Sequence, residues 1–121
     1  MIEKLGAQLY TVREYAKTPE EIRKAFHKVK EIGYKSVQVS GLGPIAAEEL
    51  AEISKETGLP IVCTHSPFQR MVDDLDKLIE EHKIYGCDYI GLGGMPVEYR
   101  KTREGVMEFV KIFNGIADRA F

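Results

Sequence analysis

Apolar residues along the chain form two alternating kinds of pattern. Four short runs mix β-branched and other apolar residues with single polar positions, which is typical of strands in a sheet. These runs occupy residues 5–11, 36–40, 60–67 and 89–92. After each run, apolar residues recur every three or four positions, the spacing that lines one face of a helix. The pattern predicts a single α/β domain over residues 1–121, built from four strand-helix units.

Specific residues mark where the predicted helices begin and end. The first helix begins at Thr18, which can cap it, and continues with Pro19, which suits the first helical position. A left-handed glycine closes each of the first three helices. The same joint of helix, glycine, short link and strand occurs at Gly33, Gly58 and Gly86. Because this joint recurs at the length of one βα module, we expect the strands to be parallel.

The first and last predicted helices have the clearest apolar stripes. Each stripe is wide enough to bury one helix face against a sheet. The third helix is expected to run unbroken from about Met71 to Gly86. The stripes of the first and last helices consist of Ile22, Phe26, Val29 and Ile32, and of Val106, Phe109, Val110, Phe113, Ile116 and Ala117.

Polar residues inside the predicted strands favour one sheet architecture over another. On the second strand, Ser36, Gln38 and Ser40 share one face, and valines occupy the other. On the first strand, Gln8 and Tyr10 share a face. An open, doubly wound sheet is expected to be apolar on both faces, whereas a barrel wall turns polar on its inner face near the active-site mouth. Because a barrel needs eight units, the four units predict half of a (β/α)8 TIM barrel, with helices on the outer face.

Four segments also resemble a known family. They are Gly6-Ala-Gln-Leu-Tyr-Thr-Val-Arg13, Glu31-Ile-Gly-Tyr-Lys-Ser-Val-Gln-Val-Ser40, Thr57-Gly-Leu-Pro-Ile-Val-Cys-Thr-His65 and Gly86-Cys-Asp-Tyr-Ile-Gly91. In this order they resemble the N-terminal half of the sugar phosphate isomerase/epimerase family, whose members are xylose isomerase-like TIM barrels. The resemblance covers essentially the whole chain.

The resemblance implies metal-assisted chemistry on sugars. In the family a divalent metal ion (Mn, Zn or Mg) lies at the carboxyl ends of the strands and assists proton transfer next to a carbonyl group. Its usual ligands come mainly from strands 5 to 8, which would follow the fourth helix. We therefore expect this sequence to be half a barrel, whether truncated, disrupted or natural, and we assign it no metal ligand and no catalytic residue.

The resemblance and the strand ends together indicate four substrate-binding residues. His65 lies where relatives place a histidine that contacts substrate or metal, although a structural histidine donating to a backbone carbonyl fits the pattern as well. Gln38 stands where many relatives have a glutamate, so it can bind a hydroxyl group but cannot act as a general base. Gln8 and Tyr10 could line a sugar pocket or simply form a polar layer inside the barrel.

Three functions remain open from the sequence. The first is an isomerase or epimerase acting on a small sugar or sugar phosphate, with the missing ligands supplied by a second half. The alternative is a non-catalytic half-barrel that self-associates into a homodimer, because an open inner face and two open sheet edges favour association. A flavodoxin-like binding module ranks last, and it would require a reversed strand order with helices on both faces of the sheet.

Composition narrows the class of protein further. A net charge of −2 and a pI near 5.9, without a basic stripe, argue against nucleic-acid binding. No apolar run approaches the length of a membrane span and no signal peptide is evident, so a cytoplasmic protein is expected. Cys63 and Cys87 have no metal-site spacing and are expected to be reduced thiols. His27 and His82 fall within predicted helices and are expected to be packing or surface residues.

Overall fold

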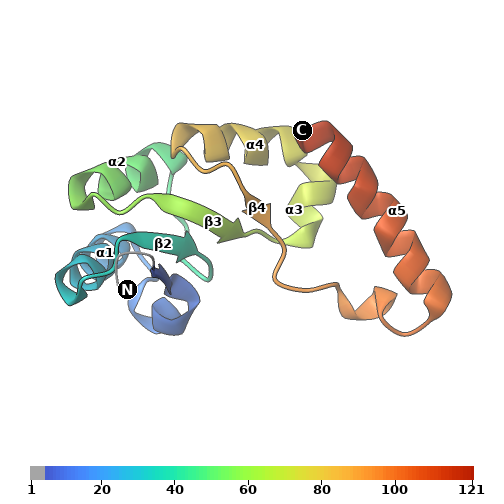
Figure 1. Ribbon diagram of the computed structural model, residues 1–121, viewed down its shortest axis with the longest axis horizontal. Helices are drawn as coiled ribbons and strands as arrows, with labels where there is room; N and C mark the ends of the chain where they lie inside the picture. Colours follow the sequence, from blue (N-terminus) through green and yellow to red (C-terminus); the bar gives the residue numbers. More distant parts are fainter. Residues whose placement is uncertain (1–4) are drawn as a thin grey trace.

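The computed structural model describes residues 5–121, in which four parallel strands form one sheet (Figure 1). The strands are β1 (Gly6–Gln8), β2 (Ser36–Val39), β3 (Ile61–His65) and β4 (Ile90–Gly91). Their order in the sheet follows the chain, β1-β2-β3-β4, and every neighbouring pair is parallel. This sequential order confirms the expected βα repeat and contradicts the reversed order of a flavodoxin-like module.

Helical segments connect the strands and continue after the last one. They are η2 (Leu9–Tyr15), α1 (Pro19–Ile32), α2 (Ala47–Thr57), α3 (Phe68–Asp73), α4 (Leu75–Ile84), η3 (Val97–Tyr99) and α5 (Arg103–Ala120). Contacts join α1 to α2, α2 to α4, and α4 to both α3 and α5. Helices α1, α2 and α4 therefore form a continuous layer along the sheet, and α5 extends away from it (Figure 1).

Two sequence predictions of secondary structure were wrong. The first strand was expected to reach Thr11, but it ends at Gln8 and a 3-10 helix begins. The turn is closed by the Thr11 hydroxyl, which donates to the Gln8 carbonyl at 2.8 Å, and it directs Leu9 into the core. The third helix was expected to be unbroken, but Asp74 leaves helical geometry (φ −142°, ψ 38°) and separates α3 from α4.

The predicted helix ends are confirmed. The Thr18 hydroxyl accepts a hydrogen bond from the Glu21 amide at 3.2 Å, and the Glu21 carboxylate accepts one from the Lys17 amide at 2.8 Å. These bonds satisfy two donors at the start of α1, which otherwise lack partners. Three helix-ending glycines have the expected left-handed conformation, with φ of 111° at Gly33, 65° at Gly58 and 68° at Gly86.

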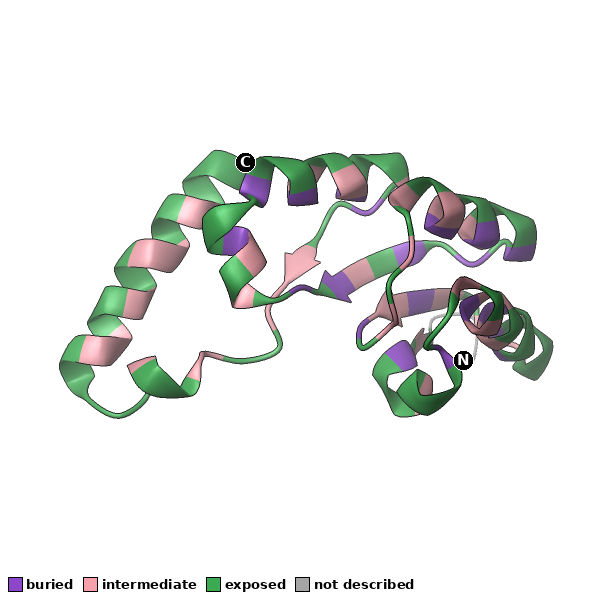
Figure 2. Cartoon of the chain, turned by 180° about the vertical axis from the view of Figure 1, so that it is seen from behind, coloured by how far each residue is buried: buried purple, intermediate pink, exposed green. Residues whose placement is uncertain are grey.

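The main core lies between the sheet and the helices α1 and α2. Figure 2 shows buried residues concentrated on the helix faces that point toward the strands. Ile32 was expected in the apolar stripe of α1 but is 64% exposed, because it is the last residue of that helix. The cluster consists of Leu9, Ala16, Ile22, Phe26, Val29, Val37, Leu50, Ile53, Leu59, Ile61 and Cys87.

Helix α5 is packed differently from the helices before it. None of its 18 residues is buried, although the apolar stripe predicted from the sequence is present. The helix is held at one end by an ion pair between Arg119 and Asp76 at 3.0 Å, and along its length by contact of Phe109 with Phe68 at 5.4 Å between ring centroids. The apolar face of α5 is therefore incompletely covered.

The outer edges of the sheet are open. Among residues 5–121, no further strand pairs with β1 or β4 on their free sides. The inner sheet face, opposite the helices, exposes Gln8, His65 and nearly half of Val62 (46%). No helix in the described part of the chain is both long and apolar enough to cross a membrane.

Candidate functional site

The carboxyl ends of the strands bring the candidate residues to one rim of the sheet. Gln8 ends β1 and pairs in register with Gln38 of β2. Gln38 is in turn opposite Cys63, and His65, the last residue of β3, is opposite Gly91. In parallel α/β sheets this rim is where ligands bind.

A bulge in β3 determines which side chains face inward. Val37 is opposite Ile61, but the next residue, Gln38, is opposite Cys63, so β3 has one extra residue at Val62. The buried positions of β3 are therefore Ile61 and Thr64, three residues apart. The irregularity leaves Val62, Cys63 and His65 toward the inner face, beside Gln38.

The clearest contact of this rim joins Gln38 and His65. The amide Nε2 of Gln38 lies 2.8 Å from the ring Nε2 of His65. An amide nitrogen can only donate, so the ring nitrogen accepts and the imidazole proton is on Nδ1. If the amide turns over, its oxygen accepts instead from a protonated Nε2. The imidazole is thus held by a neighbouring side chain, and among residues 5–121 it makes no hydrogen bond to a backbone carbonyl.

Glycines at the end of β4 and in the loop after it allow the chain to pass close to this pair. A Cβ atom at Gly91 would lie 2.2 Å from the backbone oxygen of Thr64, and one at Gly93 would lie 3.2 Å from Nδ1 of His65. The first distance is far below any contact that real Cβ atoms make. Because they have no side chain, these glycines let the backbone lie close to the end of β3 and to the imidazole of His65.

Tyr10 does not share a strand face with Gln8, because it belongs to the 3-10 helix that follows β1. Its ring lies under the Arg13 guanidinium, with 4.1 Å between the guanidinium carbon and the ring centroid. It also approaches Gly41 in the loop after β2, where a Cβ would lie 2.7 Å from the ring. Tyr10 therefore lies near the end of β2, half exposed, and has no hydrogen bond to Gln38 or His65 within the described residues.

Behind the rim lies a buried polar network that the sequence did not predict. The Thr64 hydroxyl is 2.7 Å from Nε2 of His82 and 3.1 Å from the Ser66 hydroxyl. His82 Nδ1 donates to the Leu78 carbonyl at 2.8 Å. Since this nitrogen holds the proton, Nε2 accepts from Thr64. Burial is the main reason why the pKa of His82 is lowered.

This network anchors the end of β3 to α4. Thr64 and Ser66 flank His65 in the sequence, so the network fixes the backbone on both sides of the exposed imidazole. Alternation around His65 could have indicated that its neighbours point the other way. Nothing in the sequence pattern pairs them with His82, which is 18 positions from Thr64.

A cavity of about 370 Å³ adjoins His65 between the ends of β2 and β3. Its cationic residue, Arg70, donates to Glu81 at 2.9 and 3.2 Å and lies 3.5 Å from Asp74. Because both carboxylates compensate the guanidinium charge, the cavity suits neutral hydroxyl groups better than a free anion. The hydroxyl of Ser40, buried in its wall, has no hydrogen-bond partner among the described residues.

The rim does not fit a divalent metal ion by itself. Within residues 5–121, no three His, Cys, Asp or Glu side chains gather as a metal-binding group. Hard divalent ions require several oxygen or imidazole ligands at one point. His65 instead has an amide and glycine backbone around it. The two thiols, Cys63 and Cys87, are both free.

Comparisons with known proteins support the fold. No protein-family model matches the chain, and no curated protein matches its sequence. Its structure is similar to the crystal structure of a sugar phosphate isomerase/epimerase from Parabacteroides distasonis, with a TM-score of 0.69 and 18% sequence identity. The likeness covers 99% of this chain and 49% of that one, so the chain spans about half the length of the structure it matches. The fold is therefore that of half a TIM barrel.

Proposed function

We propose that this chain is the sugar-binding half of a barrel in the sugar phosphate isomerase/epimerase lineage. The observation that carries the proposal is the Gln38–His65 pair, 2.8 Å apart at the carboxyl ends of adjacent strands. The half-barrel fold and the four sequence segments that resemble the family support the assignment of lineage.

The chemistry of the rim is that of hydroxyl recognition. Gln38 offers both a donor and an acceptor, and the imidazole of His65 offers one of each in its neutral form. Two such groups side by side match neighbouring hydroxyls of a sugar, which also donate and accept. Gln8, exposed at the end of β1, adds a second amide in register with Gln38. Tyr10 contributes a phenol near the loop after β2.

Proton transfer is not assigned to this chain alone. The side-chain amide of Gln38 cannot take up a proton and so cannot act as a general base. Among the described residues no group of side chains could bind a metal ion. A metal would supply polarisation of the substrate carbonyl in a full barrel. Its ligands would have to come from a second half. The sequence prediction of a Mn, Zn or Mg cofactor thus becomes a proposal about the completed barrel.

Titration with a ketopentose and with its phosphate ester, followed by amide and imidazole NMR shifts, tests this function. We expect shifts at Gln38, His65 and the loop after β4, and Q38A and H65A should each weaken binding by up to about tenfold, the value of one hydrogen bond. H27A serves as a matched control, because His27 lies on α1 and pairs with Glu56 of α2 at 2.6 Å. Shifts that spare the strand ends, or equal weakening by H27A, would contradict the proposal.

A further inference from the structure

The chain exposes more surface than a compact protein of its mass. Its accessible surface is 8062 Å². A compact monomer of 13.7 kDa is expected to expose about 6,600 Å². The excess of about 1,500 Å² is more than one partner contributes to a standard protein interface, about 800 Å². The surface is therefore large enough to include an interface that a stable dimer requires.

The open surface is concentrated at the two edges of the sheet. Tyr89, which is 69% exposed, and α5, which has no buried residue, lie next to the free side of β4 (Figure 2). The free side of β1 begins at Leu5, which is also exposed. Unpaired strand edges present a row of backbone donors and acceptors, which only another strand satisfies fully.

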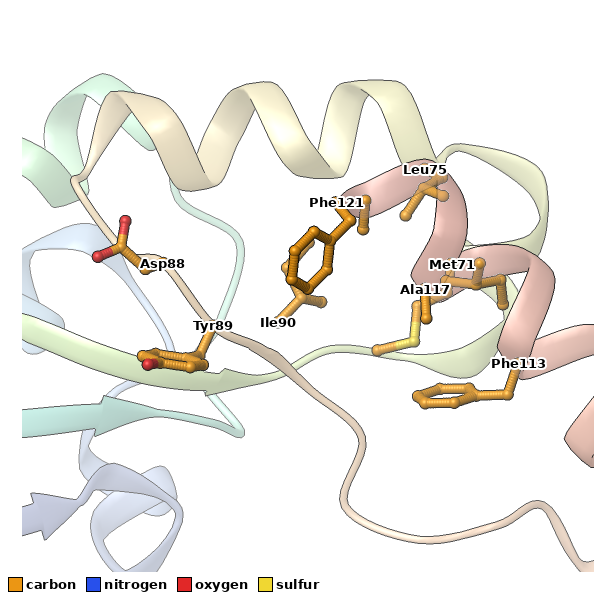
Figure 3. A pocket seen from close by; sticks show the side chains of 10 residues that line it. Met71, Leu75, Asp88, Tyr89, Ile90, Phe113, Ala117 and Phe121 are labelled. Atoms are coloured by element: carbon orange, nitrogen blue, oxygen red, sulfur yellow. The ribbon is translucent and has the colours of Figure 1, made fainter.

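An apolar groove runs between β4 and α5. Figure 3 shows Phe113 and Ala117 of α5 beside Met71 of α3, and Phe121, which follows α5, near Ile90 of β4; all five line the groove. Its volume is about 250 Å³. A strand paired with the free side of β4 would lie beneath α5 and bring its outward side chains to this groove. The outward residue of β1 is Ala7, which packs toward the helix layer and is small enough for such a position.

We propose that a second copy of this chain is the occupant, with β4 of each protomer pairing in parallel with β1 of the other around a two-fold axis. Under two-fold symmetry the contact between β4 of one protomer and β1 of its partner occurs twice, so both edges of each sheet are paired. Eight strands then form a closed sheet, which has no edges. A partner that pairs with both edges needs a matching curvature and outer helices, and a second copy of this chain has both.

Charge on the inner face is compatible with this pairing. The strand side chains on the inner face include Gln8, Ser36, Gln38, Val62, Cys63 and His65, and none of these is a carboxylate or an ammonium group. Two-fold symmetry places like residues across the axis, so a charged inner face would repel its copy. In the closed dimer the two Gln38–His65 pairs open on one shared mouth, so each protomer completes the sugar-binding rim of the other. The described strand residues on the inner face of a second copy add no carboxylate for a metal ion, so this dimer extends the proposed sugar binding and not the proposed metal chemistry.

Multi-angle light scattering on size-exclusion chromatography, over a range of concentrations, tests the proposal. We expect a species with twice the mass of one 13.7 kDa chain. V62E places two carboxylates inside the closed sheet and should weaken the dimer by more than about a hundredfold. I84E is the matched control, because Ile84 is similarly exposed (37%) but ends α4 in the helix layer, away from both edges. Circular dichroism establishes that both variants remain folded.

Hydrogen exchange supplies an independent readout. The amides of β1 and β4 should become protected as the dimer forms, whereas those of β2 should not change. A chain that stays monomeric at high concentration, open-ended larger oligomers, or equal effects of V62E and I84E would overturn the proposal. Dimerisation without a change in protection at β1 and β4 would place the interface elsewhere and would overturn it as well.

Discussion

Replacement of His82 by glutamine should change how the stability of the protein depends on pH. His82 is 3% exposed, and both ring nitrogens are bonded, one to Thr64 and the other to the Leu78 carbonyl. The Tyr85 hydroxyl also lies 3.0 Å from Nδ1 of the ring. The geometry holds the neutral ring, and burial lowers its pKa below the ordinary 6.5. In the unfolded chain the ring regains that ordinary value.

The sign of the effect follows from proton uptake. Below about pH 6.5 the unfolded state binds a proton that the folded state does not, so the free energy of unfolding falls as the pH decreases. The contribution of His82 is fully present above pH 6.5 and is lost as the pH falls toward its folded-state pKa. The slope is at most about 1.4 kcal/mol per pH unit for one proton. H82Q removes this slope and, through two altered hydrogen bonds, costs about 1–3 kcal/mol at neutral pH.

Urea unfolding at several pH values between about 5 and 8 measures both effects. Carboxyl groups with a lowered pKa, such as that of Glu56, change the free energy of unfolding only below their ordinary pKa of 4.5. That range lies outside the pH values of this experiment. Arg70 and Glu81 also influence the His82 pKa and remain in the variant, so they cannot account for a difference. H27Q controls for the loss of a histidine at the surface. Parallel stability curves for the wild type and H82Q would refute the reasoning.

Two further predictions concern backbone contacts. G91A should destabilise the fold by about 1–3 kcal/mol, because the new Cβ would lie 2.2 Å from the Thr64 backbone oxygen. G94A is the control: its Cβ would have no neighbour within 4 Å, so its stability in thermal unfolding should stay within about 0.5 kcal/mol of the wild type. T18A should lower the free energy of unfolding by about 1 kcal/mol, because it removes the N-cap of α1. T102A removes the N-cap of α5, which has no buried residue, and should lower it by less in the same urea titration. Equal losses would contradict this difference in packing.

Much of the fold could be predicted because it depends on local signals. Repeated helix-glycine-strand joints and strand-like runs indicate a parallel sheet without any knowledge of long-range contacts. The end of β1 could not be predicted in the same way. Residues 5–11 alternate as a strand would, but burial of Leu9 and the Thr11–Gln8 bond favour a turn. Tertiary packing there overrides the local pattern.

The candidate site was predictable only in outline. Parallel strands bring their carboxyl ends together, so the neighbourhood of Gln38 and His65 follows from the fold class. Their direct contact depends on the bulge at Val62, since strict alternation would place Ile61 on the same face as His65, and Ile61 is buried. Bulges leave no dependable trace in a hydrophobic pattern. His82 was expected as an ordinary helix residue, and its role in the network depends on distance in space.

The different positions of the two cysteines make the protein suitable for site-selective labelling. Cys87 is buried in the core, and burial raises the pKa of its thiol, which disfavours the reactive thiolate. Cys63 lies half-buried on the inner sheet face, opposite Gln38. A maleimide fluorophore would therefore attach at Cys63 in the folded monomer, without any engineered residue. Its emission would then report directly on whatever enters the space in front of the sheet.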